Sequence, residues 1–181
     1  GNDATFVFSS TDYRFFIRNS DCVEIRNLNV DWNWKESPLA SVVTVQNSNA
    51  DTNTLDLVFK DAEYCDENCR LMAITQCDPE TYTFGAKYSS KEVYLYQDET
   101  SIKSVQKISN NTLRVTHNGC MNGFENGETY ILRHFVYDGT VFSVRNESEN
   151  ITFNNVAVYG GAGMGYIFED NCSHFQVINS F

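Results

Sequence analysis

The chain has 181 residues, 41% of them hydrophobic and 14% aromatic, so it can bury a core as one large domain or two small ones. Its 13 Lys and Arg residues face 24 Asp and Glu residues, and the formal net charge of −11 repels nucleic-acid phosphates and anionic lipid. We therefore expect no nucleic-acid partner, and because no apolar run approaches about 20 residues, we expect no membrane span.

The first predicted elements lie in residues 16–31 (FIRNSDCVEIRNLNVD), and the same pattern returns twice near the end of the chain. Residues 144–159 (VRNESENITFNNVAVY) and 168–181 (FEDNCSHFQVINSF) align with the first copy without a gap. The apolar positions alternate in each copy, which is typical of short strands with one buried face. In the first strand the aligned residues are Phe16, Val144 and Phe168.

One column of this alignment holds only asparagine, namely Asn27, Asn155 and Asn179. Asn tolerates the left-handed backbone of a tight corner, and its amide can hydrogen-bond the same amide in the next copy. Stacked Asn columns are a feature of parallel β-solenoids, in which each coil buries its face against its neighbours. We expect adjacent parallel coils, the alternative being three unrelated hairpins of similar composition.

Between the first two copies the sequence predicts an inserted domain. The second and third copies start 24 residues apart, as for a single coil, whereas the first and second start 128 apart, an excess of 104 residues. Alternating or apolar runs between turn-forming clusters predict six strands there, at residues 41–45, 54–59, 71–74, 92–96, 112–115 and 129–132. These strands suggest a small barrel or sandwich, with room for a short helix at residues 62–70. The expected division is β-helix coil at 1–35, inserted domain at 36–137 and β-helix coils at 138–181.

The six cysteines are irregularly spaced. Cys65, Cys69 and Cys77 lie close in sequence, but neither a second pair nor a nearby His completes a zinc-binding set, so we expect no metal. Unpaired thiols are the favoured interpretation, and a disulfide stays open.

The order of several segments carries a family resemblance. The first coil ends in NLNVD at residues 27–31, a Pro-Leu pair opens the insertion, and the chain re-enters the coils at YILRH, residues 130–134. ITFNNV at residues 151–156 and YGGAGMG at residues 159–165 follow. In these segments the sequence resembles glycoside hydrolase family 110, the α-1,3-galactosidases, over nearly the whole chain. The resemblance implies an all-β fold in which right-handed parallel β-helix coils carry an inserted antiparallel β-barrel or sandwich domain.

The resemblance also implies an activity. It points to a secreted bacterial glycosidase, extracellular or periplasmic, that acts on terminal galactosides of glycans by an inverting mechanism without a metal or other cofactor. The family's catalytic carboxylates lie in later coils, in Asp-Gly and Asp-Asp-x-x-Asn segments, and neither pattern follows Gly165. We therefore expect the catalytic acids outside this chain, and this chain alone to be inactive. A polysaccharide lyase of the same architecture and a non-catalytic glycan-binding or adhesin module stay open as alternatives.

Within the chain the candidate catalytic carboxyls are Asp31, Glu169 and Asp170. Inverting hydrolysis needs two carboxyls about 6.5–9.5 Å apart, one of them held protonated. Asp31 marks the exit toward the insertion, where it could face a cleft. Glu169 and Asp170 precede a corner, where a solvated turn is the favoured interpretation.

The candidate substrate-binding residues are Trp32, Trp34, Gly163 and Met164. The two Trp side chains lie where the chain leaves the first coil for the insertion, and they could stack on a sugar ring. The favoured interpretation is that they fill the joint between coil and insertion, which also needs a large apolar surface. The glycine-rich residues 160–165 predict a flexible turn, which could also let a substrate approach the backbone.

A glycan is the expected partner, and a second copy of the chain is another. The start Gly1-Asn2-Asp3 is not typical of a natural N-terminus, so we interpret the chain as a piece of a longer protein. A solenoid edge that the longer protein would cover is then exposed, which predicts weak self-association.

Overall fold

A computed structural model describes residues 4–9, 14–85, 91–119, 123–134, 139–160 and 163–181. The chain divides into two compact units, which we call the parallel unit (Gly1–Ser37 with Val136–Phe181) and the half-barrel unit (Pro38–Phe135). The expected insertion, residues 36–137, starts and ends within two residues of the half-barrel unit.

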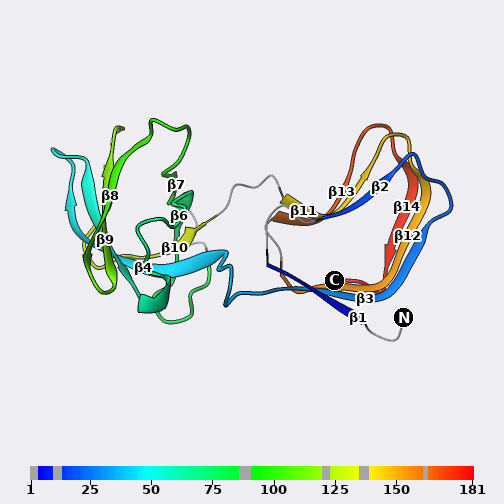
Figure 1. Cartoon of the computed structure of the whole chain (residues 1–181), viewed down its shortest axis with the longest axis horizontal. Coiled ribbons are helices and arrows are strands. Elements are labelled where there is room, and N and C mark those ends of the chain that lie inside the picture. The colour runs from blue at the N-terminus through cyan, green and yellow to red at the C-terminus, as the bar shows by residue number, and fades with distance from the viewer. Residues whose placement is uncertain (1–3, 10–13, 86–90, 120–122, 135–138, 161–162) are drawn as a thin grey trace. The chain divides into compact units, whose positions relative to one another are not determined.

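The parallel unit contains two sheets in which every pair of neighbouring strands is parallel (Figure 1). One sheet has the order β1-β3-β12-β14, made of Ala4–Phe8, Glu24–Trp32, Glu149–Val158 and Ser173–Ile178. The other has the order β13-β11-β2, made of Gly163–Phe168, Gly139–Arg145 and Phe15–Arg18. The three copies of the repeat thus supply neighbouring strands in both sheets.

The register of the first sheet follows the spacing of the sequence repeat. Phe153 on β12 pairs with Ile25 on one side and with Val177 on the other. These partners are 128 and 24 residues away along the chain, the two offsets of the alignment. The predicted parallel pairing of the three copies is therefore confirmed.

The gapless alignment is wrong by one residue in the first strand. The register pairs Phe16 with Ser143, and Ile17 with Val144. Because Ile17 is buried and Phe16 is half exposed, the inward position belongs to Ile17. One extra residue in the following corner of the second copy restores the register.

The Asn corners repeat one backbone conformation. Asn27, Asn155 and Asn179 have φ values of 55°, 55° and 52°, which confirms the left-handed conformation predicted for this column. Asn155 Nδ2 donates to Asn27 Oδ1 at 2.9 Å, whereas Asn179 Nδ2 donates to Asn154 Oδ1 at 3.2 Å. The side-chain amides of the Asn column therefore bond each other between the first two copies, whereas in the third copy the bond goes to the residue before the column.

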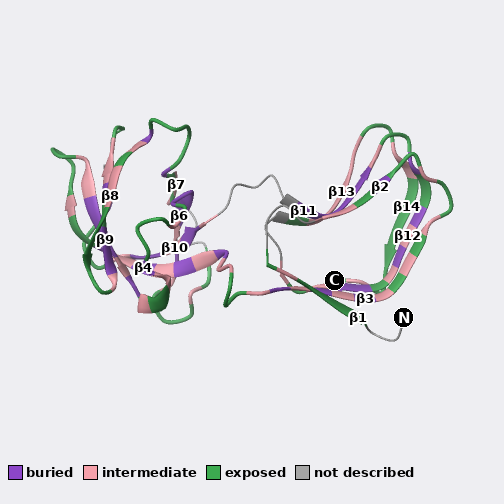
Figure 2. Ribbon diagram, viewed as in Figure 1, coloured by how far each residue is buried: buried purple, intermediate pink, exposed green. Residues whose placement is uncertain are grey.

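The two parallel sheets enclose one hydrophobic cluster. Phe142 on β11 and Phe153 on β12 are fully buried, with ring centroids 5.0 Å apart. The other buried members of this cluster are Ile17, Leu28, Val30, Val141, Val144, Ile151 and Val156. Figure 2 shows buried stretches along the strands of this unit. The buried apolar residues of β2, β3, β11 and β12 therefore face the opposite sheet.

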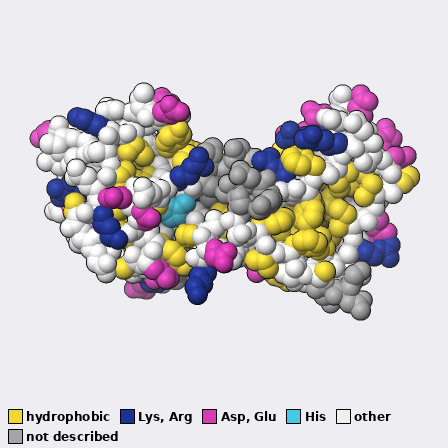
Figure 3. Space-filling view, viewed as in Figure 1, with side chains coloured by type: hydrophobic (Ala, Val, Ile, Leu, Met, Phe, Trp, Pro, Cys, Tyr) yellow, Lys and Arg dark blue, Asp and Glu magenta, His cyan; other side chains and the backbone are white. Residues whose placement is uncertain are grey.

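The last copy is much less covered than the middle one. Phe175 and Val177 on β14 are exposed, although their cross-strand partners Ile151 and Phe153 are buried. Figure 3 shows hydrophobic side chains gathered over this unit. β14 is an edge strand of its sheet, and the Phe168 ring at the end of β13 stacks on Phe175 at a centroid distance of 3.9 Å.

The half-barrel unit contains one antiparallel sheet of the order β7-β6-β10-β4-β5-β9-β8, curled into a half-barrel (Figure 1). In chain order its strands are β4 (Ala40–Asn49), β5 (Thr54–Phe59), β6 (Ala73–Gln76), β7 (Glu92–Tyr94), β8 (Ile102–Ser109), β9 (Thr112–His117) and β10 (Thr129–Arg133). Because β7 and β8 are the two edges of this sheet, it is not a closed barrel. The expected helix at residues 62–70 is only a 3-10 turn, η1 (Ala62–Tyr64).

The half-barrel unit has its own core. Leu55 and Leu57 of β5, Leu113 of β9 and Tyr130 of β10 are completely buried within it. Beside this core, the carboxylate of Asp56 accepts two hydrogen bonds from Arg114, at 2.7 and 2.8 Å. The chain as a whole is therefore all-β, with stacked parallel strands in one unit and a curled antiparallel sheet in the other.

Candidate functional site

The end of β3 brings together three of the residues singled out from the sequence. Asp31 and Trp34 approach Gly160, where an added Cβ would lie 3.6 Å from both Asp31 Oδ1 and Trp34 Nε1 and 3.1 Å from Trp32 Cβ. A glycine is therefore what allows this close approach. Trp32 is only 4% exposed and its Nε1 donates to the carbonyl of Ser37 at 2.5 Å, whereas Trp34 is 46% exposed. Of the two, only Trp34 offers a ring to solvent.

Two further aromatic side chains extend this region. The register that pairs Val158 with Val30 sets Tyr159 beside Asp31, and Tyr159 is 59% exposed. The ring of Phe181, 72% exposed, meets the Tyr159 ring edge-on at a centroid distance of 5.4 Å. Two backbone hydrogen bonds hold this arrangement: the N–H of Phe181 donates to the carbonyl of Val156, and the N–H of Val158 donates to the carbonyl of Phe181. We call Asp31, Trp34, Tyr159, Gly160 and Phe181 the Tyr159 face.

The chemistry available at the Tyr159 face is stacking beside a carboxylate. Asp31 Oδ1 accepts the backbone N–H of Trp32 at 2.7 Å, which leaves its other oxygen for a further donor. Exposed aromatic rings offer flat apolar surfaces, and a nearby carboxylate accepts hydrogen bonds from hydroxyl groups. A polyhydroxylated ring with one apolar face matches this combination.

The other candidate acids do not form a catalytic pair. Glu169 Oε2 is ion-paired with Arg145 Nη2 at 2.6 Å. Asp170 is an exposed corner residue with φ of 57°, and its carbonyl accepts the N–H of Glu147. This arrangement fits the favoured interpretation of a solvated turn.

The two remaining candidates lie on a strand. Gly163 and Met164 begin β13 and pair with Gly139 and Thr140 of β11. The expected turn at residues 160–165 is therefore wrong from Gly163 onward, because ladder hydrogen bonds to β11 fix this segment as strand, and its residues 161–162 lie outside the described residues. Met164 is 52% exposed.

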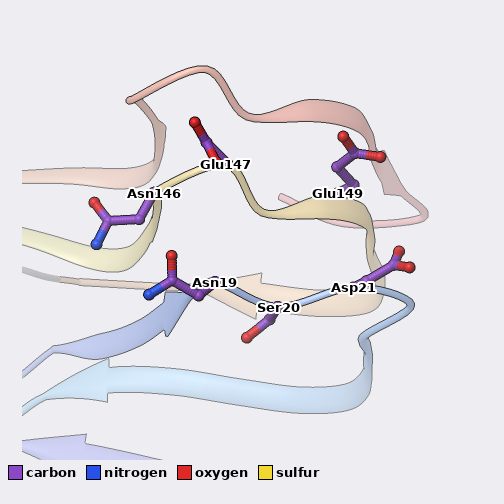
Figure 4. A pocket seen from close by; sticks show the side chains of 6 residues that line it. All are labelled: Asn19, Ser20, Asp21, Asn146, Glu147 and Glu149. Atoms are coloured by element: carbon purple, nitrogen blue, oxygen red, sulfur yellow. The ribbon is translucent and has the colours of Figure 1, made fainter.

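An acidic pocket lies at another corner of the parallel unit. Its volume is about 270 Å³, and its lining residues are Asn19, Ser20, Asp21, Asn146, Glu147 and Glu149. Figure 4 shows the two Asn side chains at one end, with Asp21 and Glu149 at the other.

The acids of this pocket are poorly placed for proton transfer. Hydrogen bonds from Asn150 and Cys22 lower the pKa of Asp21, so this carboxyl is ionised at neutral pH. The Glu147 and Glu149 side chains are exposed, and water screens their charges. We therefore assign no catalytic role to the pocket.

Side chains of His, Cys, Asp and Glu are the usual metal ligands of proteins. No group of three or more His, Cys, Asp and Glu side chains there is arranged to hold a metal ion. Cys22, Cys65, Cys69, Cys77 and Cys172 are free thiols, and Cys120 lies outside the described residues. No helix in this part is both long and apolar enough to cross a membrane.

Comparison of the sequence with protein-family models finds no match, and comparison with curated proteins finds none either.

Sequence reasoning missed Tyr159 and Phe181. The signal for Tyr159 was present, because the repeat offset of 128 residues sets it opposite Asp31. Phe181 gave no such signal, since its position depends on how the last corner folds back along β12.

Proposed function

We propose that this chain is part of a carbohydrate-active β-helix protein, in which it binds glycan through the Tyr159 face. The observation that carries the proposal is the grouping of three exposed aromatic rings beside the carboxylate of Asp31. Rings of this kind stack on sugars, and a carboxylate beside them fixes orientation by accepting hydroxyl hydrogen bonds.

The resemblance to the α-1,3-galactosidases supplies the proposed substrate, terminal galactosides of glycans, and the inverting mechanism. Such a mechanism needs an acid and a base facing each other across one sugar. Since Glu169 is ion-paired with Arg145 and Asp170 is an exposed corner residue, we propose that the catalytic acids lie outside this chain. The proposed localisation is extracellular or periplasmic, as for a secreted bacterial hydrolase. The right-handed β-helix belongs to the same proposal, supported by the stacked parallel strands.

The test is binding and turnover by the purified chain. Isothermal titration calorimetry with α-1,3-linked digalactose should give weak binding, which Trp34→Ala and Tyr159→Ala each reduce at least tenfold. Phe84→Ala is the matched control, because Phe84 is a similarly exposed aromatic in the half-barrel unit. Galactoside turnover by this chain that Asp31→Asn abolishes would show that the active site is here. Equal binding by all variants would remove the Tyr159 face from the proposal.

The proposed weak self-association rests on the exposed apolar side chains of β14. Val177→Lys places a charge on this edge and should lower the sedimentation coefficient at high protein concentration. A monomeric native chain across the concentration series would exclude self-association.

A further inference from the structure

The outward face of the β13-β11-β2 sheet is basic, although the chain is acidic. Phe142 and Val144 of β11 point into the core, so Ser143 and Arg145 point to the opposite face. The register pairs these two residues with Phe16 and Arg18 of β2. On the other side, Ser143 pairs with Ile167 of β13.

Arginines surround the exposed ring of Phe16 on this face. The guanidinium carbon of Arg18 lies 4.3 Å from the ring centroid, and that of Arg14 lies 5.4 Å from it. Arg145 adds a third guanidinium, which pairs with Glu169 at 2.6 Å. We call Arg14, Phe16, Arg18, Ser143 and Arg145 the arginine face. Figure 3 shows basic side chains beside hydrophobic ones over this unit.

Two polar atoms of this face are buried without a partner. Ser143 is completely buried, and its Oγ makes no hydrogen bond. Arg145 Nε is likewise buried and unpaired. Such atoms are rare in folded proteins, because burial removes their hydrogen bonds to water. The Ser143 hydroxyl can donate or accept, whereas Arg145 Nε–H only donates, so a ligand with acceptor oxygens can satisfy both groups.

We propose that the arginine face binds the carboxylate of an acidic saccharide, a uronic acid unit in an oligosaccharide. A carboxylate only accepts hydrogen bonds, and its two oxygens match the planar fork of a guanidinium. Arg18 is exposed and can change rotamer to meet the carboxylate. The apolar surface of Phe16 and Ile167 then lies under the sugar ring. This inference rests on the proposed function, since it names a saccharide class for the same protein.

The net charge of −11 does not oppose this binding at short range. At physiological ionic strength charges are screened beyond about 8 Å, so a bound carboxylate responds mainly to the guanidinium groups it touches. The distant acidic side chains repel the ligand as it approaches and so slow its association, an effect that is weaker at higher salt.

The experiment is calorimetric titration of the purified chain with tetra-galacturonate, with a neutral galacto-oligosaccharide of the same length as comparison. We expect the acidic tetramer to bind at least tenfold more tightly than the neutral one. Arg18→Gln should remove most of this difference, and Ser143→Ala should reduce it several-fold. Lys103→Gln is the matched control, because it deletes an exposed charge in the half-barrel unit and should change nothing. Circular dichroism checks that each variant is folded.

The outcomes separate the two proposals. Equal affinity for acidic and neutral tetramers, or full acidic binding by Arg18→Gln, would overturn the arginine face while leaving neutral binding at the Tyr159 face intact. Tighter binding of a sulfated tetramer than of the carboxylated one would overturn the assignment of a carboxylate. Binding of neither tetramer, together with no digalactose binding, would remove both proposals.

Discussion

The two units bury their apolar residues in different ways. The half-barrel unit curls one antiparallel sheet around a core drawn from most of its strands. In the parallel unit the inner face of the middle copy is buried, whereas Phe175 and Val177 of the last copy are exposed. Of the fourteen large hydrophobic residues that are exposed in the described chain, ten lie in the parallel unit, which is the smaller of the two. The stability of a stacked array thus depends on burial against neighbouring copies, whereas a curled sheet buries its apolar residues against one another.

The sharpest test of this comparison is a pair of core substitutions, one in each unit. Phe153 is fully buried between the sheets of the parallel unit, so Phe153→Ala should lower its free energy of unfolding by about 3–5 kcal/mol. Both tryptophans, Trp32 and Trp34, lie in that unit. Tryptophan fluorescence in a urea titration therefore reports its unfolding alone, and the midpoint should fall.

Leu113→Ala is the matched variant in the half-barrel unit. Leu113 is equally buried, and its truncation should lower the free energy of unfolding by about 2–5 kcal/mol. Circular dichroism should detect this loss, while the tryptophan transition should stay unchanged. If Leu113→Ala moved both transitions together, the two units would unfold as one, and the comparison would fail.

The parallel pairing was predictable because three copies share a period and an Asn corner. Asn27 and Asn155 bond each other as the column predicts. The one-residue shift of register at Phe16 was not predictable. The corners differ in length by one residue, and the alternation of apolar residues does not reveal the length of a corner. The backbone of a β-strand can point either of two successive residues inward. Which of them is buried is therefore decided by the packing of the complete stack.

In the half-barrel unit the sequence predicted six strands but missed β8 (Ile102–Ser109). This strand is an edge with exposed Lys103 and Lys107, and such strands lack the apolar alternation on which the prediction relied. For the candidate site, Asp31 and Trp34 were recognised from their place at the exit. Their proximity to Tyr159 depends on the register between β3 and β12, which are far apart in sequence.

A second test compares how charge is held in the two units. Asp56 of the half-barrel unit is buried and accepts hydrogen bonds from Arg114 and Asn47, whereas Glu169 of the parallel unit pairs with Arg145 nearer to solvent. Asp56→Asn should therefore lower the free energy of unfolding at pH 7 by about 1–2 kcal/mol. Glu169→Gln should cost less than about 1 kcal/mol.

The pH dependence of the Asp56 effect has a definite sign. The hydrogen bonds from Arg114, followed by that from Asn47, lower the pKa of Asp56 in the folded chain. Its contribution is therefore complete above the unfolded-state pKa of about 3.9 and is lost as pH falls through the lower folded value. Urea titrations followed by circular dichroism should show the gap between native chain and Asp56→Asn narrowing below about pH 4. A gap that is constant from pH 7 down to acid would contradict this origin.

The last test concerns the Asn corners of the parallel unit, where the difference expected between two variants at one position is about 1 kcal/mol. Asn155 has a φ of 55° and donates to Asn27, but it is exposed, so water can replace part of the lost hydrogen bond. Asn155→Ala should lower the free energy of unfolding by about 1–2 kcal/mol, through the lost bond and the positive φ. Asn155→Gly loses the same bond but tolerates this φ, and should recover about 1 kcal/mol relative to Ala. Asn154→Ala is the control, because it removes the acceptor of Asn179 at a position without positive φ. All three are measured by the tryptophan midpoint in urea, and equal midpoints for the Ala and Gly variants would show that the left-handed corner does not set the stability of the stack.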